Sequence, residues 1–366
     1  MSRPCPGTSD RPGRRGAALA CLFAGILAAG AATGAWPDPA GGAETADPTD
    51  AGELVGERAG DRWAAAYSAE EYAEVRRTLE GEYVGTGISV VRTSGGRIEV
   101  SEVHAGSPAE AAGIRPGDRL LTIDGAALDG EAVTDAVGRL RGSDEPERAG
   151  PGSTVLLGVE REGRRWEAEV ERARLAVDPV TVARDEGVTR IHVSSFTRGS
   201  ADLVRAAAAS APEEDGILLD LRGNAGGLID EAAGAASAFL DGGLVATYDV
   251  RGDQRALHAE PGGDTDTPLV VLVDGGTMSS AELLTGALQD RNRAVVVGSR
   301  TFGKGTVQMP SEQPDGSVAE LTVGHYATPR GRTVDDDGIL PDLVVPPGGD
   351  AEAEARTVLG GLAESG

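Results

Sequence analysis

The segment from residue 269 to residue 308 determines much of the fold, and it reads LVVLVDGGTMSSAELLTGALQDRNRAVVVGSRTFGKGTVQ. Its apolar run at 269–273 predicts a buried strand, which is followed by a turn at Asp274 and a helix over 281–289. The apolar residues 294–298 predict a second buried strand that leads into a glycine-rich turn. Strands and helices that alternate in this way predict a layered α/β core.

A serine and a lysine occupy the two turns of this segment. Ser279 precedes the predicted helix, and Lys304 follows 25 residues later (304 − 279 = 25), between two glycines. A serine hydroxyl becomes a nucleophile when a base removes its proton, and a lysine amine acts as that base only when burial keeps it neutral. Backbone N–H groups at the start of the helix would stabilise an oxyanion. The serine motif and the lysine motif each also have a purely structural interpretation. Ser279 and Glu282 match a capping box, and Phe-Gly-Lys-Gly fits a solvated turn.

Together with Gln308, four residues beyond the lysine, this pattern resembles the carboxy-terminal processing peptidases, also called tail-specific proteases. The resemblance covers about residues 65–345. It rests on Thr-Met-Ser-Ser-Ala-Glu (277–282), on Thr-Phe-Gly-Lys-Gly-Thr-Val-Gln (301–308), and on matching blocks at 219–228, 321–323, 326–332 and 338–342.

The resemblance implies a role for each matching residue. Ser279 matches the family nucleophile, Lys304 its general base, and Gln308 the glutamine that orients the lysine amine. The backbone N–H groups of Ser280 and Gly226 match the oxyanion hole. The order Ser-Ser-Ala-Glu departs from the family's usual Ser-Ala-Ser-Glu, so Ser280 is a second candidate for the nucleophile. The spacing to the lysine favours Ser279.

A β-rich domain is expected over about 83–172. Its short strand patterns, its glycine turns and one amphipathic helix near 131–141 resemble a PDZ domain. The loop made of Gly85, Thr86, Gly87 and Ile88 matches the PDZ loop whose backbone N–H groups bind a peptide's terminal carboxylate, while the peptide adds a strand to the sheet. The other interpretation is a structural β-domain that binds nothing.

The helix of this domain has two features that bear on recognition. Val133, Val137 and Leu140 lie on one face and indicate a small aliphatic pocket for a peptide's terminal side chain. Arg141 matches an arginine that, in relatives, is thought to contact the catalytic domain when substrate is bound. An acidic stretch at 143–148 lengthens the next loop here, and a surface arginine that caps the helix is an equally good interpretation.

The amino terminus has the features of an export signal. A basic stretch precedes an uncharged apolar run from about residue 17 to residue 32. Small residues permit cleavage after Ala35; alternatively, the run stays as a single membrane anchor with its basic end inside. Either outcome places the working domains outside the cytoplasmic membrane, secreted or anchored to it.

Composition excludes several other classes of function. The net charge of −25 argues against nucleic acid or an anionic membrane surface as a partner. Both cysteines, Cys5 and Cys21, lie in the predicted signal, so no disulfide is expected after its removal. No metal and no other cofactor is expected, because the four histidines lack metal-site spacing and the Ala-Gly-Gly turn at 225–227 lacks nucleotide-binding spacing.

The sequence therefore predicts an α/β multi-domain chain with a PDZ-like β-rich domain and an α/β layered serine-peptidase core. We expect a secreted or membrane-tethered serine endopeptidase with a Ser–Lys dyad, which recognises free carboxy termini of proteins or peptides and cleaves in or near these regions. The alternative is a catalytically silent PDZ-containing peptide-binding or scaffold protein. The expected parts are a signal peptide or anchor (1–35), a disordered linker (36–62), an N-terminal helix (63–82), the PDZ-like domain (83–172), the peptidase core (173–349) and a C-terminal tail (350–366).

Within the core, the expected elements before the opening segment are strands at 187–193 and 216–221, helices at 200–209 and 229–240, and a polar, glycine-rich surface loop at 252–267.

Overall fold

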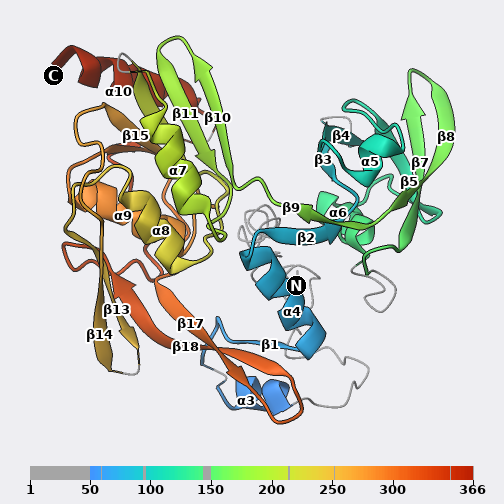
Figure 1. Ribbon diagram of the computed structural model, residues 1–366, viewed down its shortest axis with the longest axis horizontal. Coiled ribbons are helices and arrows are strands. Elements are labelled where there is room, and N and C mark those ends of the chain that lie inside the picture. Colours follow the sequence, from blue (N-terminus) through green and yellow to red (C-terminus); the bar gives the residue numbers. More distant parts are fainter. Residues whose placement is uncertain are drawn as a thin grey trace, which may run out of the picture.

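The computed structural model describes residues 50–365, except residues 59, 94–95, 143–149, 213–214, 251 and 347. The predicted export signal, residues 36–49 of the predicted linker and the acidic stretch at 143–148 lie outside the described residues. Figure 1 shows an α/β core on the left and a smaller β-rich domain on the right. In the part of the chain that the structure describes, no helix is both long and apolar enough to cross a membrane.

A six-stranded sheet forms the centre of the core, in the order β10-β11-β12-β15-β16-β19. Its neighbouring strands are parallel except for the pair β10 and β11. The strand β15 reads Leu-Val-Val-Leu-Val and is buried at every position, which is typical of a strand covered on both faces. The bounds are β10 (Val180–Asp185), β11 (Val188–Val193), β12 (Gly216–Asp220), β15 (Leu269–Val273), β16 (Val295–Gly298) and β19 (Leu343–Val344).

Helices cover both faces of this sheet (Figure 1). Side chains such as Leu219 pack with α7 (Ser200–Ala209), α8 (Ile229–Ala236) and α9 (Ser280–Asp290) on one face. Side chains such as Leu218 pack on the other face with Ala355 and Leu359 of α10 (Ala351–Ser365). The assignment of 350–366 as a tail is therefore wrong, because α10 buries its apolar residues and completes the third layer.

A second, antiparallel sheet projects from the core, in the order β1-β18-β13-β14, with β17 also paired to β18. Its strands are β1 (Ala65–Tyr67), β13 (Leu244–Val250), β14 (Asp253–His258), β17 (Thr306–Glu312) and β18 (Val318–Ala327). The helix α3 (Asp50–Glu57) packs on this sheet, and the fully buried Ala51 joins a small core with Ala319 and Leu321.

Three expectations for these segments need correction. Residues 50–57 of the predicted linker form a helix, because α3 buries apolar residues against β18. The predicted helix at 63–82 begins later, as α4 (Ala69–Leu79), after the strand β1. The predicted surface loop at 252–267 begins with β14, which pairs with β13 in a hairpin.

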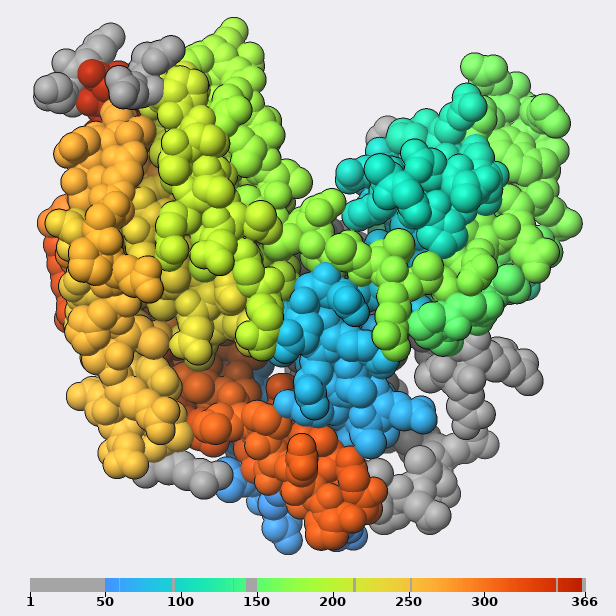
Figure 2. All heavy atoms as spheres, viewed as in Figure 1, coloured from blue at the N-terminus to red at the C-terminus, as the bar shows by residue number. Residues whose placement is uncertain are grey.

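The β-rich domain has a sheet in the order β3-β4-β5-β7-β8, with β6 (Ala126–Ala127) paired to β5. Two short strands, β2 (Glu82–Gly85) and β9 (Ala173–Ala176), pair with each other and join this domain to the core. Figure 2 shows an open groove between the two bodies. The remaining bounds are β3 (Ile88–Arg92), β4 (Ile98–Val103), α5 (Pro108–Ala111), β5 (Arg119–Ile123), α6 (Val133–Arg141), β7 (Thr154–Arg161) and β8 (Arg164–Glu171).

Candidate active site

Ser279 lies where the central strand β15 turns into α9. Its backbone has φ 55° and ψ −120°, a conformation that non-glycine residues rarely adopt. Surrounding contacts hold this strained residue: the Tyr326 hydroxyl donates to the Ser279 carbonyl at 2.9 Å, and Thr277 Oγ1 donates to the Leu221 carbonyl at 2.9 Å. Strain that the neighbours maintain is common at catalytic positions, because it fixes the direction of a reacting group.

Burial separates the two candidate serines. Ser279 is partly exposed, whereas Ser280 is only 1% exposed. The Ser280 hydroxyl is buried and has no hydrogen-bond partner among the described residues. A substrate could reach Ser279 without rearrangement of the chain, so this geometry favours Ser279.

The loop that contains Gly226 lies directly against Ser279. A Cβ on Gly226, which has φ +100°, would lie 3.0 Å from both the Met278 carbonyl oxygen and Ser279 Cβ. Asn224 holds the loop, because its side-chain Nδ2 donates to the Val193 carbonyl and its backbone carbonyl accepts from Met278 N–H. Only glycine permits this close approach of the two turns.

The two predicted oxyanion donors differ in their present hydrogen bonds. The Gly226 N–H donates to Asn224 Oδ1 at 2.8 Å. The Ser280 N–H, in the first turn of α9, has no acceptor among the described residues. Ser280 therefore offers a free donor near Ser279, whereas Gly226 would have to share its N–H or exchange its bond.

The lysine turn packs on the serine turn. Phe302 N–H donates to the Thr277 carbonyl at 3.0 Å, which joins the two turns directly. Gly303 has φ +95°, and a Cβ there would lie 3.0 Å from the backbone of Asp336. Gly305 N–H donates to Asp335 Oδ1 at 2.9 Å. The glycines on either side of Lys304 thus allow the chain to turn tightly at this point.

The Glu282 carboxylate connects Ser279 to the lysine turn. Its Oε2 accepts the N–H groups of Ser279 and Lys304, both at 2.9 Å, and its Oε1 accepts the Thr301 hydroxyl at 2.6 Å and the Gly303 N–H at 2.8 Å. Glu282 has no exposed surface, and its burial raises its pKa while these four hydrogen bonds oppose that shift. The sequence indicated only a helix cap here, so this bridge between the two turns is new.

We expect Glu282→Gln to lower both activity and stability. One carboxylate oxygen would become an NH₂ group that faces two donors, either Ser279 and Lys304 or Thr301 and Gly303. Hydrogen bonds to a charged group contribute about 1.5–3 kcal/mol each, so the free energy of unfolding should fall by roughly 3 kcal/mol or more. Thermal unfolding and peptide cleavage would measure the two effects. Unchanged values for both would show that Glu282 does not connect the turns.

The Lys304 side chain lies over an aromatic ring. Its Nζ is 5.1 Å from the centre of the Trp63 ring, and that ring contacts Phe302 at 5.8 Å between centroids. Burial lowers the pKa of Lys304, and the carboxylates of Glu320, Asp61 and Glu282 oppose this shift. Among the described residues no hydrogen bond joins Lys304 Nζ to Ser279 Oγ, so the two turns lie together but these two side chains do not bond to each other.

One sequence signal for this lysine was missed. Lys304 is the only lysine among the 34 basic residues of the chain, and the others are arginines. Guanidinium groups stay protonated, whereas a lysine amine loses its proton when its surroundings are apolar. The single lysine thus occupies the position where a deprotonable amine would matter.

The structure does not bring the Gln308 amide to Lys304. Gln308 Nε2 donates to Thr306 Oγ1 at 2.6 Å and to Thr322 Oγ1 at 3.3 Å. No hydrogen bond between Gln308 and Lys304 is present among the described residues. The role of Gln308 in orienting the amine stays a prediction.

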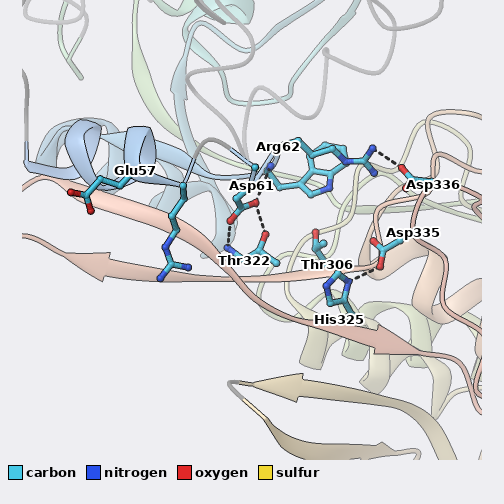
Figure 3. Close-up of a pocket in the computed structure, with 11 residues that line it drawn as sticks. Glu57, Asp61, Arg62, Thr306, Thr322, His325, Asp335 and Asp336 are labelled. Atoms are coloured by element: carbon cyan, nitrogen blue, oxygen red, sulfur yellow. Dashed lines mark hydrogen bonds and ion pairs between the residues drawn. The ribbon is translucent and has the colours of Figure 1, made fainter.

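An open pocket of about 830 Å³ lies beside the lysine turn, between the segment that precedes β1 and the β17–β18 hairpin. Figure 3 shows its polar lining: Asp61 bonds to Thr322, Arg62 pairs with Asp336, and His325 pairs with Asp335. Trp63 also lines it. No group of three or more potential metal ligands occurs among the described residues.

In the β-rich domain, the predicted carboxylate loop at 85–88 joins β2 to β3. Gly87 has φ +82°, and a Cβ there would lie 2.2 Å from Ser107 Cβ. In the described sheet β3 pairs only with β4, so its other edge is free for an added strand next to α6. On α6, Leu140 packs in the domain core, while Val133 and Val137 are half-buried.

Arg141, at the end of α6, faces the strand that connects the two bodies. Its guanidinium lies 5.6 Å from the centre of the Tyr83 ring of β2. Burial lowers the pKa of Arg141, and the nearby Glu74 carboxylate opposes the shift. In this structure the arginine thus contacts the connecting strand β2.

Comparisons with known families find a match for the α/β core and another for the β-rich domain. Residues 187–345 match the model described as peptidase family S41, and residues 74–149 match the PDZ domain. The carboxyl-terminal-processing protease of Synechocystis sp. is 35% identical over 287 residues, which are 75% of this chain and 66% of that protein. A probable CtpA-like serine protease of Staphylococcus aureus is 32% identical over 292 residues, which are 78% of this chain and 57% of that protein. The chain thus spans about two thirds of the length of the first relative and little more than half of the second.

Two solved structures have a similar fold. The photosystem II D1 C-terminal processing protease matches with a TM-score of 0.52 and 26% identity, over 85% of this chain and 84% of that one. A putative S41 protease from Bacteroides fragilis matches over the full length of both chains with a TM-score of 0.57. Its identity is 16%, so this second match shows the fold alone.

Proposed function

Because the chain belongs to peptidase family S41 and carries a PDZ domain, we propose that it is a serine endopeptidase that uses Ser279 and Lys304. The observation that carries this proposal is the Glu282 carboxylate, which holds the N–H groups of both residues at 2.9 Å. Two residues that are 25 positions apart are thereby fixed in adjacent turns. The half-buried position of the only lysine supports its use as a base.

Catalysis would proceed through an acyl-enzyme. Ser279 Oγ attacks the carbonyl carbon of the scissile peptide while its proton passes to the neutral Lys304 amine, which must first come within hydrogen-bond distance. The oxyanion accepts the Ser280 N–H, and also the Gly226 N–H if that group turns from Asn224. The C–N bond then breaks, and the Lys304 ammonium gives its proton to the leaving amine. Water hydrolyses the ester after Lys304 takes one of its protons.

The PDZ domain would select substrates by their free carboxy termini. A terminal carboxylate would meet the backbone N–H groups of the loop 85–88, and the preceding residues would pair with the free edge of β3. The half-buried Val133 and Val137 favour small aliphatic terminal side chains. Export through the predicted signal at 1–35 would place this reaction outside the cytoplasmic membrane, as a secreted or anchored enzyme.

The proposal is tested with one unstructured protein substrate that carries a free, an amidated or an Asp-extended carboxy terminus. We expect the free terminus to be cleaved about tenfold faster than the amide, because each hydrogen bond to a charged group contributes about 1.5–3 kcal/mol. The Asp-extended substrate should also be slower, because the chain has a net charge of −25, and added salt should reduce that difference. Cleavage products are measured by mass spectrometry.

Two glycine variants provide the control for this test. Gly87→Ala places a Cβ 2.2 Å from Ser107 Cβ and should remove the preference for a free terminus. Gly106→Ala has similar backbone strain, with φ +74°, but meets nothing within 4 Å, and should keep the preference. Equal cleavage of all three substrates by the unaltered protein would show that the PDZ domain does not read carboxylates. Absence of any cleavage would favour the alternative of a peptide-binding protein.

A further inference from the structure

Asp61 lies in the turn that precedes β1 and is bonded to the β17–β18 hairpin. Its two carboxylate oxygens accept the hydroxyl and the N–H of Thr322, both at 2.8 Å (Figure 3). The oxygen that accepts the hydroxyl also accepts the Trp63 N–H at 3.2 Å. The ring of Trp63 is the one that lies 5.1 Å from Lys304 Nζ. Asp61 thus joins the hairpin to the residue that contacts the lysine.

The bond to Asp61 determines what the Thr322 hydroxyl can do for its other neighbour. An ionised carboxylate only accepts hydrogen bonds, and a threonine hydroxyl has a single proton to donate. Burial raises the pKa of Asp61, but its hydrogen bonds, chiefly those from Thr322, hold the pKa below its ordinary value. The Thr322 hydroxyl therefore gives its proton to Asp61, and towards Gln308 Nε2, at 3.3 Å, it can only accept.

This direction of the hydrogen bonds orients the side-chain amide of Gln308. Its nitrogen has two N–H groups, and it donates to Thr306 Oγ1 at 2.6 Å and to Thr322 Oγ1 at 3.3 Å. The amide oxygen has no hydrogen bond among the described residues and is left as an acceptor. A neutral lysine amine has N–H donors and one lone pair, so an acceptor that binds one N–H fixes the direction of the lone pair.

We propose that Asp61 is a positioning residue of the peptidase, which acts through the Thr322 hydroxyl and fixes the Gln308 amide with its nitrogen on the threonines and its oxygen available to Lys304. This inference rests on the proposed function and on the predicted role of Gln308 in orienting the amine. Asp61 acts through two other side chains and does not touch the reacting bond. Without its carboxylate, the Thr322 hydroxyl can donate to the amide oxygen, and the amide can reverse.

The first test is a double-mutant cycle of Asp61→Asn and Gln308→Ala in the full chain. The rate is measured on the alkaline plateau of the pH profile, where a change in the charge of Lys304 has no effect. Asp61→Asn alone should lower kcat about tenfold and leave KM within about twofold, because the base is misdirected while substrate contacts remain. With Gln308→Ala present, the same change should lower kcat by less than about twofold. A tenfold loss that persists without Gln308 would overturn the proposal.

Two sets of variants control this test. Thr322→Val removes the hydroxyl and should reproduce the loss of kcat, whereas Thr322→Ser keeps the hydroxyl and should restore most of the rate. Asp315 makes the same kind of attachment on the same hairpin, because it accepts the N–H and the hydroxyl of Ser317 and the N–H of Asp50 in α3. Asp315→Asn should leave kcat unchanged. An equal loss in Asp315→Asn would show that only the attachment of the hairpin matters and would overturn the proposal.

The second test observes the amide directly. The chain has four glutamines, so protein with ¹⁵Nε2-labelled glutamine gives four side-chain NH₂ signals, and Gln308→Ala identifies one of them. The spectra are recorded in the Ser279→Ala background, which prevents self-cleavage. Asp61→Asn and Thr322→Val should shift the Gln308 signal and leave the other three in place, and Asp315→Asn should not shift it. A Gln308 signal that Asp61→Asn does not move would contradict the proposal.

The outcomes separate this inference from the proposed function. If Ser279→Ala or Lys304→Arg still cleaves, the proposed function fails, whatever Asp61 does. If both variants are inactive but Gln308→Ala keeps full activity, the Ser–Lys dyad is retained and the inference fails. If Gln308→Ala loses activity but Asp61→Asn does not, the inference alone fails. If Asp61→Asn is unfolded, the valine and serine variants of Thr322 decide the question through the same rate and the same signal.

Discussion

Ser279→Ala is expected to abolish cleavage and to leave the fold intact. Removal of a nucleophile should lower kcat/KM by at least about a thousandfold, because no other group can form the acyl-enzyme. The contacts that hold residue 279 use its backbone. Its N–H donates to Glu282 Oε2, and its carbonyl oxygen accepts a hydrogen bond from the Tyr326 hydroxyl. Alanine keeps both, and a lost helix cap would cost only roughly 0.5–2 kcal/mol. Mass spectrometry of substrate fragments and thermal unfolding measure the two outcomes.

Ser280→Ala is the matched control for this prediction. The Ser280 hydroxyl is buried without a partner among the described residues, so its removal should cost little. Its N–H, the predicted oxyanion donor, is unchanged. We expect substantial activity. An inactive Ser280→Ala together with an active Ser279→Ala would exchange the roles of the two serines.

The sequence predicted the core elements well where the pattern is unambiguous. β15 and α7 have the predicted bounds. The continuous apolar run of β15 indicates a strand that is covered on both faces, and the apolar periodicity after Gly199 indicates a helix. The β17–β18 hairpin and α10 were not predicted as elements. Apolar residues alternate or repeat only weakly in these segments. Their apolar side chains are buried by partners that are distant in the chain, such as Ala51 against Ala319.

The site was predicted at the level of residue type and not of contact. The motifs place Ser279 and Lys304 in adjacent turns, but spacing cannot show that one carboxylate, Glu282, bonds to both. The contribution of Trp63 was missed because its spacing with Tyr67 also fits a helix. Ser68 and Glu71 form a capping box that starts α4, so this local signal could have indicated that the helix begins after residue 68.

Lys304→Arg is expected to be inactive, although it keeps the positive charge. Guanidinium stays protonated at any working pH and cannot accept the proton of Ser279 Oγ. Arginine also stacks on aromatic rings, so a position over Trp63 remains available and folding should be retained. Thermal unfolding close to that of the unaltered protein, with a loss of cleavage comparable to that of Ser279→Ala, is the expected pair of results. An active Lys304→Arg enzyme would remove the lysine from the mechanism.

The cleavage rate of the unaltered enzyme is expected to rise with pH. Burial lowers the pKa of Lys304 below its ordinary value of 10.5, and only the neutral amine can act as base. The rate should therefore be low where the lysine is protonated and rise with pH through its lowered pKa. Gln308→Ala should keep this profile with a smaller loss of rate, because Gln308 would at most orient the amine and takes no proton; its amide bonds to Thr306 and Thr322 in this structure. A rate that falls as pH rises across this range would mean that an acid, and not a neutral amine, controls the reaction.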